Sequence, residues 1–107
     1  MPLPKHTKIY LDYFGYDVNS WIACEVIGCN KQGIDINHLK CKGAGGSKLM
    51  DFPANLMAMC REHHQELGDR ADKINFLIEC HEHATGMTNV KEKINEVLKI
   101  RGIALIL

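Results

Sequence analysis

The chain has 107 residues with 13 basic and 13 acidic side chains, so its formal net charge is zero. Apolar residues make up 46% of the sequence and charged residues 24%, a globular balance that excludes a disordered chain. The sequence has no apolar run of about eighteen residues or more, which excludes a spanning helix. It also lacks an N-terminal secretory pattern. We therefore expect one cytoplasmic domain over residues 1–107.

The cysteines indicate metal binding more than disulfides. The sequence has five of them, an odd number, and disulfides are rare in a reducing compartment. Cysteine and histidine that occur together there are more typical of metal ligands. Cys41 and Cys80 have no partner at ligand spacing, so we expect Cys41 in a loop and Cys80 in the core.

The first third of the chain predicts a helix and a β-hairpin. Apolar residues at helical spacing predict a helix over residues 7–14, capped by Thr7 and ended by Gly15. Residues 21–24 form a short apolar run, and residues 34–39 alternate apolar and polar side chains. Because a turn rich in glycine and asparagine separates these two runs, we expect them to pair as a hairpin.

A loop and a second helix are expected next. Residues 40–48 are rich in glycine and lysine, which predicts a loop. Residues 56–67 carry apolar side chains at helical spacing, and Gly68 follows as the expected end of this helix.

Two further helices complete the expected elements. A helix is predicted from about residue 72 to 84, where Gly86 follows, and another over residues 90–99, capped by Thr88. The apolar tail, residues 103–107, is expected to pack within the chain or against a partner. The fold class is thus α+β: a hairpin and a helix in a core of about residues 21–69, flanked by helices, with the C-terminal helices over about residues 72–101.

Two pairs of residues have the spacing of zinc ligands. Cys24 and Cys29 fall on the expected hairpin, and Cys60 and His63 lie three positions apart on the expected helix. Structural zinc takes four tetrahedral cysteine or histidine ligands, commonly as two short-spaced pairs. Such an ion ties the hairpin to the helix and stabilises a small core. Cys24 and Cys60 are alternatively ordinary buried cysteines.

A second polar set lies beside these pairs. Asn37 and His38 end an expected strand, and His64 directly follows His63. Neighbouring residues on a helix point about 100° apart, so His63 and His64 serve different sites. His64 is therefore available for a second site, or it is simply a solvated surface residue.

These residues, in order, resemble a known nuclease family. The segments Ile34-Asp35-Ile36-Asn37-His38-Leu39 and Asn55 to His64, separated by a glycine-rich loop, are similar to the HNH endonucleases. The resemblance covers about residues 24–69 and is greatest to small phage and prophage members that carry two cysteine or cysteine–histidine pairs. It implies a ββα-metal core, in which a hairpin and a helix hold one divalent metal.

The resemblance also implies roles for four residues. His38 corresponds to the general base that activates water, and Asn37 and His64 correspond to ligands of a catalytic Mg²⁺, Mn²⁺ or transition ion. Asn55 corresponds to the central asparagine, which holds the loop by hydrogen bonds to backbone and so orients His38. A plain Asx-turn is the alternative for Asn55. The ion stabilises charge on the phosphoryl and leaving oxygens during phosphodiester hydrolysis.

The sequence departs from the family pattern at three positions. Ile27 stands where the second cysteine of the first pair is usual. Asn37 replaces the usual aspartate or histidine, and we expect Asp35 to assist only if the strand is irregular. Gly68 stands where many members carry a further histidine, which leaves Asp69 as a weak third ligand.

The resemblance implies DNA as the partner, and the basic residues of the core are the candidates to contact it. Lys40, Lys42 and Lys48 flank the glycines of the loop after His38, and Arg61 begins the second ligand pair. Contacts from these side chains position phosphates without reading sequence, although each is alternatively solvated. The expected function is metal-dependent DNA cleavage. The alternatives are an inactive, zinc-stabilised module that binds DNA or a protein, and a nuclease directed at RNA.

Overall fold

The computed structural model describes residues 3–40, 48–68 and 70–107. The predictions on Cys41, Lys42 and Asp69, and on the side chain of Lys48, lie outside the described residues. The helices are α1 (Lys5–Phe14), α2 (Arg61–Leu67), α3 (Ile74–Thr85) and α4 (Val90–Ile100); the strands are β1 (Asp35–His38) and β2 (Leu56–Met59); and the short 3-10 turns are η1 (Lys48–Met50), η2 (Pro53–Asn55) and η3 (Ala71–Lys73). This mixture of helices with a two-stranded sheet confirms the α+β class.

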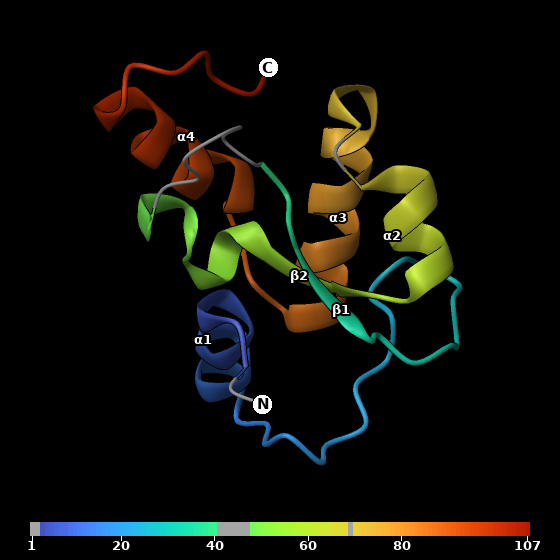
Figure 1. Cartoon of the computed structure of the whole chain (residues 1–107). Helices are drawn as coiled ribbons and strands as arrows, with labels where there is room; N and C mark the ends of the chain where they lie inside the picture. Colours follow the sequence, from blue (N-terminus) through green and yellow to red (C-terminus); the bar gives the residue numbers. More distant parts are fainter. Residues whose placement is uncertain (1–2, 41–47, 69) are drawn as a thin grey trace.

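The sheet pairs different segments from those predicted. β1 runs antiparallel to β2, with Asp35 opposite Met59 and His38 opposite Leu56. The hairpin predicted between residues 21–24 and 34–39 is present only as a short pairing of residues 22–24 with 31–33. A bridge joins Ala23 to Gln32, with backbone hydrogen bonds from Cys24 to Lys31 and from Gly33 to Ile22, and residues 35–38 pair with β2 instead. The order of elements is strand, strand, helix, with a long connection between the strands (Figure 1).

The helix predicted over residues 56–67 is wrong in its first third. Residues Leu56–Met59 form a strand with all four side chains buried, and helix α2 begins only at Arg61. A short, fully buried apolar run is compatible with either element, and here pairing with β1 decides in favour of the strand. Cys60 is the N-cap of α2, and its Sγ accepts a hydrogen bond from the backbone N–H of His63 at 3.4 Å.

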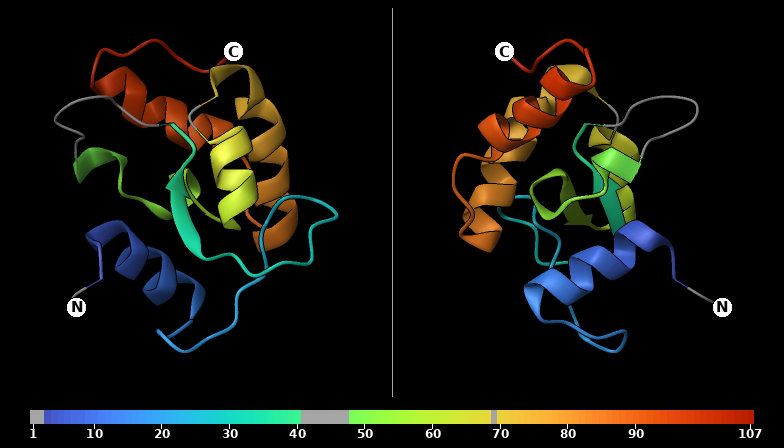
Figure 2. Two further views of the ribbon diagram at one scale, coloured as in Figure 1. Left: turned by 45° about the vertical axis from the view of Figure 1, so that its right-hand side comes forward. Right: turned by 90° about the vertical axis from the view of Figure 1, so that its left-hand side faces the viewer.

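The two faces of the sheet pack against different helices. Leu56 and Ala58 join a small apolar cluster with Tyr10 of α1. Met57 and Met59 belong to the main core. Figures 1 and 2 show the sheet between α1 on one side and α3 on the other. The main core gathers buried side chains of β2, α3, α4 and the tail: Met57, Met59, Leu77, Ile78, Cys80, Val90, Ile94, Leu98 and Ile106.

The predicted positions of the other three helices are confirmed, but two of their predicted N-caps are not. Helices α1, α3 and α4 lie where periodicity placed them, and α1 and α3 end at Gly15 and Gly86, whose φ values are 78° and 77°. Glycine adopts this left-handed backbone without steric cost. The predicted caps Thr7 and Thr88 are wrong, since the N-cap positions are Pro4 and Asn89.

The apolar tail packs within the chain. Ile106 is buried, its backbone N–H donates to Oδ1 of Asn95 at 2.7 Å, and its carbonyl accepts from Nδ2 of the same side chain at 3.0 Å. The tail thus returns along α4 (Figure 2). No helix in the described parts of the chain is both long and apolar enough to cross a bilayer.

Candidate functional site

The two predicted ligand pairs come together as one cluster. Cys24, Cys29, Cys60 and His63, which we call the sulfur cluster, place one ligand atom each within 4.8 Å of the others. His63 Nδ1 lies 3.6 Å from Cys24 Sγ and 3.3 Å from Cys60 Sγ. Tetrahedral zinc with Zn–S near 2.3 Å and Zn–N near 2.05 Å requires S···N separations of about 3.6 Å. The residues present therefore fit a tetrahedral metal ion.

The local backbone explains why Cys29 replaces the usual second cysteine. Between α1 and β1 the chain turns, and the N–H of Cys29 donates to the carbonyl of Val26 at 2.9 Å. The intervening Ile27 is exposed, and its N–H donates to Cys80 Sγ, away from the cluster. The irregular spacing thus still delivers both sulfurs to one point. Cys80 itself is fully buried, as predicted.

The thiols of the cluster differ in acidity. Burial raises the pKa of Cys24 to about 11. Burial also opposes ionisation of Cys60, but hydrogen bonds from the backbone of His63 and from neighbouring thiols lower its pKa overall. Cys60 therefore supplies thiolate more readily than Cys24, and thiolate is the form that binds metal.

His64 points away from the sulfur cluster, as the helix geometry predicted, and contacts Asp35. His64 Nδ1 lies 2.9 Å from Asp35 Oδ2, and Arg61 donates to both oxygens of the same carboxylate at 2.8 and 3.0 Å. Hydrogen bonds from Arg61, with a smaller contribution from His64, hold the pKa of Asp35 below its ordinary value, against burial that raises it. Asp35 makes these contacts from a regular strand, and its assistance to a metal stays a prediction.

Asn37 has a different neighbour. Its side chain is buried, and Nδ2 donates to Sδ of Met59 at 3.6 Å. His64 contacts Asp35, whereas Asn37 contacts Met59 in the main core. Alternation along β1 places Asp35 and Asn37 on the same face of the sheet. Asp35 is therefore the better placed partner for His64.

His38 lies on the opposite face, in a cluster with two residues that the sequence did not reveal. Its Nε2 lies 2.7 Å from Asp51 Oδ1, and its ring centroid is 4.7 Å from that of His6. All three side chains are partly buried. Asp51 is 13 positions from His38 and His6 is 32 positions away, at a spacing that no local pattern predicts.

Asn55 has the geometry expected of a loop brace. It is fully buried, and its Oδ1 accepts from the N–H of Lys40 at 2.8 Å. Its Nδ2 donates to the carbonyls of Lys40 at 3.0 Å and Met50 at 2.9 Å. The predicted hydrogen bonds to backbone are confirmed, and they join the residue that leaves β1 to the residue before Asp51.

Arg61 and Lys40, which are predicted to contact phosphate, differ in their surroundings. The guanidinium of Arg61 is paired with Asp35, although the arginine side chain is 60% exposed. Lys40 is partly exposed at the start of the loop. Phosphate contacts by Lys40 and Arg61 stay predictions, and the pairing with Asp35 engages only Nε and Nη2 of the Arg61 guanidinium.

A buried polar network was missed altogether by the sequence analysis. His81 Nδ1 lies 2.5 Å from Glu25 Oε1, and His81 Nε2 lies 2.9 Å from the carbonyl of Pro53. The other oxygen, Glu25 Oε2, accepts from the Tyr10 hydroxyl and from the N–H of Ala58. The one available signal was the position of His81 on the apolar face of its helix.

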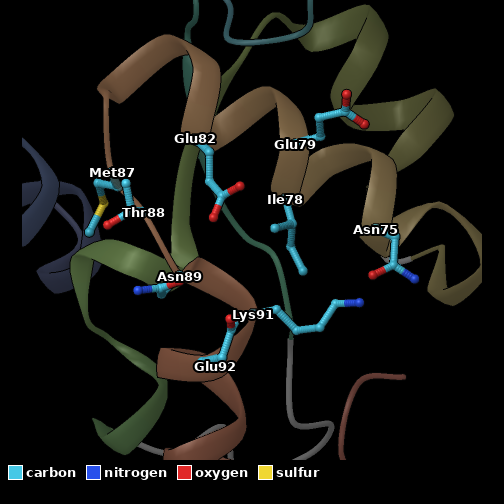
Figure 3. A pocket seen from close by; sticks show the side chains of 9 residues that line it. All are labelled: Asn75, Ile78, Glu79, Glu82, Met87, Thr88, Asn89, Lys91 and Glu92. Carbon is cyan, nitrogen blue, oxygen red and sulfur yellow. The ribbon is translucent and has the colours of Figure 1, made fainter.

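A groove between α3 and α4 does not belong to these sites. It encloses about 730 Å³, and neither the sulfur cluster nor His38 lines it. Glu79, Glu82 and Glu92 face it with Lys91 (Figure 3). Glu82 Oε2 accepts the backbone N–H of Val90 and so closes the turn between the helices. This acidic lining repels phosphate, so the groove is not a DNA site.

Comparisons of the chain with protein-family models, curated proteins and solved structures find no match. The function of the protein is therefore inferred from its residues and their geometry.

Proposed function

We propose that the protein is a metal-dependent endonuclease of the HNH, or ββα-metal, type that hydrolyses phosphodiester bonds in DNA. The observation that carries this proposal is the contact of 2.7 Å between His38 Nε2 and Asp51 Oδ1 at the end of β1. The succession of β1, β2 and α2, with Asn55 bracing the connection, supports it. So do the motif residues, which lie in the order the family resemblance requires.

Asp51 gives His38 the form that a general base needs. A carboxylate accepts hydrogen bonds, so a neutral imidazole at this distance carries its proton on Nε2 and donates it to Asp51. The lone pair then lies on Nδ1, where it takes a proton from an attacking water. Asp51 also holds the ring orientation, which lowers the cost of reaching the reactive geometry.

The catalytic metal is assigned to His64 and Asp35, with Asn37 as a further oxygen donor on the same face of β1. When bound, a divalent ion supplies charge stabilisation at the phosphoryl and leaving oxygens. Asp35 supplies the anionic ligand that Asn37 cannot. Arg61, which pairs with this carboxylate, would lie beside the bound metal, where its guanidinium could hold a phosphate.

A substrate phosphate must reach groups on both faces of one strand. Asp35 and His38 are three positions apart on β1, which has β2 on one side only. We place the phosphate across the edge of β1 that does not pair with β2, next to Lys40. A zinc ion in the sulfur cluster fixes α2, and therefore His64, relative to the preceding loop.

Plasmid cleavage tests the proposal. Purified protein is incubated with supercoiled DNA and with Mg²⁺ or Mn²⁺, beside His38→Ala and the matched control His83→Ala, whose side chain is exposed on α3. We expect nicked or linear product from wild type and His83→Ala, and a loss on the order of 100-fold or more in His38→Ala. Single-stranded RNA in parallel reactions tests the alternative substrate.

Two results would contradict the proposal. One is a wild-type protein that binds DNA but does not cleave it with any divalent metal, which would favour the zinc-stabilised binding module. The other is equal cleavage by wild type and His38→Ala. Asp35→Asn separates the metal assignment from the base assignment, because we expect it to raise the metal concentration needed for cleavage rather than abolish proton transfer.

A further inference from the structure

We propose that His6, His38 and Asp51 form a second transition-metal site, distinct from the sulfur cluster, whose occupation switches off His38 as a base. One ring nitrogen of each histidine and one oxygen of Asp51 all lie within 4.8 Å of one another. An ion with bonds of about 2.0–2.2 Å holds neighbouring tetrahedral ligand atoms about 3.3–3.6 Å apart, so a pair at the 4.8 Å limit must close by about 1.2 Å to bind one ion. The site joins the first helix to the end of β1 and to the turn before η2.

The surroundings of His6 favour metal binding. Its Nε2 lies 3.1 Å from the carbonyl of Ile36, which can only accept, so Nε2 carries the proton and Nδ1 keeps a free lone pair. Histidine ligands of metals commonly donate their second N–H to a carbonyl in this way, which fixes the ring.

The ligand set indicates the class of ion. Two imidazoles and one carboxylate suit Zn²⁺, Co²⁺, Ni²⁺ or Fe²⁺, whereas Mg²⁺ prefers oxygen ligands. Each of the three side chains is partly buried, so the set is partly desolvated yet reachable. The site is therefore expected to discriminate transition ions from the Mg²⁺ that supports cleavage.

Binding at this site changes the tautomer of His38. His38 Nε2, which faces Asp51, is the nitrogen that an ion between the three side chains takes. The proton on Nε2 moves to Nδ1, so the ring stays neutral and no net proton is lost. Nδ1 then has no lone pair to accept a proton from water. This consequence rests on the proposed function, whereas the binding itself does not.

A cobalt titration tests the binding. Protein with the sulfur cluster filled by one equivalent of Zn²⁺ is titrated with Co²⁺, and absorption distinguishes a nitrogen–oxygen site from one with thiolate charge-transfer bands. We expect wild type to bind a Co²⁺ that shows no thiolate band. His6→Gln, whose amide can still donate to Ile36, should weaken this binding about 100-fold or more, because loss of a mere supporting hydrogen bond already costs about 10- to 100-fold.

Three further variants make the test specific. Asp51→Asn should also weaken Co²⁺ binding, and it carries the test if circular dichroism shows that His6→Gln does not fold. His83→Gln, an exposed histidine on α3, should leave binding unchanged. Asp35→Asn should leave the His6-dependent binding unchanged, which separates it from an ion at His64. Co²⁺ binding by folded His6→Gln with wild-type affinity would overturn the proposal.

Inhibition is the second readout. In Mg²⁺-supported cleavage, micromolar Zn²⁺ should inhibit wild type, and His6→Gln should need about 100-fold more Zn²⁺ for the same inhibition. If the protein binds Co²⁺ through His6 but cleaves no DNA, the nuclease proposal is contradicted and the metal-site proposal is supported. A nuclease that Zn²⁺ inhibits equally in wild type and His6→Gln contradicts the switch.

Discussion

Asn55 illustrates how one side chain fixes the candidate site. Its amide makes hydrogen bonds to the N–H and carbonyl of Lys40 and to the carbonyl of Met50, and it is fully buried. These bonds bring the exit from β1 next to Asp51, which in turn contacts His38. The position of the candidate base thus depends on a residue that does not contact it.

Replacing Asn55 with leucine should destabilise the protein and displace His38. The change keeps the approximate volume but leaves three buried backbone groups without partners, so we expect unfolding free energy to fall by about 3 kcal/mol or more. Denaturant titration measures this loss. Asn75→Ala, which removes an exposed hydrogen bond to Leu107, is the control and should cost about 0.5 kcal/mol or less. Equal losses for the two variants would contradict the role of Asn55.

Gly68 is constrained by its contact with His64. A Cβ added to Gly68 would lie 2.4 Å from the carbonyl oxygen of His64 and 2.7 Å from Cδ2 of its ring. Gly68→Ala should therefore shift the end of α2 and the His64 ring, at a cost of about 1–3 kcal/mol. NMR of the histidine ring protons and thermal unfolding measure both effects. In the double variant with His64→Ala the cost should fall; strict additivity would show that the ring is not displaced.

The residues of the candidate site differ in how far the sequence reveals them. His38, Asn55 and His64 were found because the motif places them at fixed offsets along the chain. His6 and Asp51 were not found, since tertiary packing alone brings them to His38. The sequence also could not show which of Asn37 and Asp35 contacts His64, because both lie on one face of β1 and tertiary packing decides between them.

At the scale of elements, β2 shows why the hairpin prediction failed. Its four residues are all apolar and all buried, so their pattern has no period that distinguishes a strand from a helix. Residues 21–24 looked equally strand-like. They instead pair briefly with residues 31–33, and the next residue, Glu25, donates its backbone N–H to the carbonyl of Ala58 in β2. The helices α1, α3 and α4 were predictable because each has an apolar face with a period of 3.6 residues.

The sulfur cluster joins the loop before β1 to the start of α2. Cys24 and Cys29 lie in the loop before β1, while Cys60 and His63 lie at the start of α2. The exposed ion pair between Lys31 and Glu62 connects the same two segments, but a surface pair stabilises by about 1 kcal/mol at most. α2 has no fully buried residues, so its position depends on contacts at its surface: Arg61 and His64 with Asp35, Leu67 with the main core, and the sulfur cluster where a metal is bound.

Removing this metal should loosen α2. At a free zinc concentration about 1,000 times Kd, one site contributes about 4 kcal/mol, which for a chain of this size is on the order of 15 °C in Tm. We expect a chelator to lower Tm by this order and Cys29→Ser to lower both zinc content and Tm. Cys80→Ala is the control, since it should reduce stability without changing zinc content. A wild-type protein that purifies without metal, and whose Tm zinc does not raise, would contradict the assignment.

At the scale of the whole molecule, a buried polar network connects the parts around the sheet. Glu25 receives hydrogen bonds from Tyr10 of α1 and from Ala58 of β2, and its Oε1 lies 2.5 Å from Nδ1 of His81 in α3. His81 in turn donates to Pro53 at the start of η2. Burial and the adjacent carboxylate hold the pKa of Tyr10 far above its usual range, so its hydroxyl remains a donor. Both sides of the sheet are thus fixed to one carboxylate.

Glu25→Leu should be among the most destabilising substitutions in the chain. It removes the acceptor for three donors and leaves the imidazole of His81 without its carboxylate, and breaking a buried pair in this way costs about 3–5 kcal/mol. Tyr10→Phe removes one hydrogen bond to the same carboxylate and should cost about 2 kcal/mol. Because both changes act on one network, the double variant should lose less than the sum.

Denaturant unfolding measures these losses in the two single variants and in the double variant. The control is Glu79→Leu, which replaces an exposed glutamate on the same helix as His81. The exposed control should change stability by about 0.5 kcal/mol or less. If Glu25→Leu cost no more than Glu79→Leu, the network would not hold α1 and α3 to the sheet. If the double variant were strictly additive, Tyr10 and Glu25 would act independently, and the packing of α1 would have to depend on its apolar contacts with Leu56 and Ala58 alone.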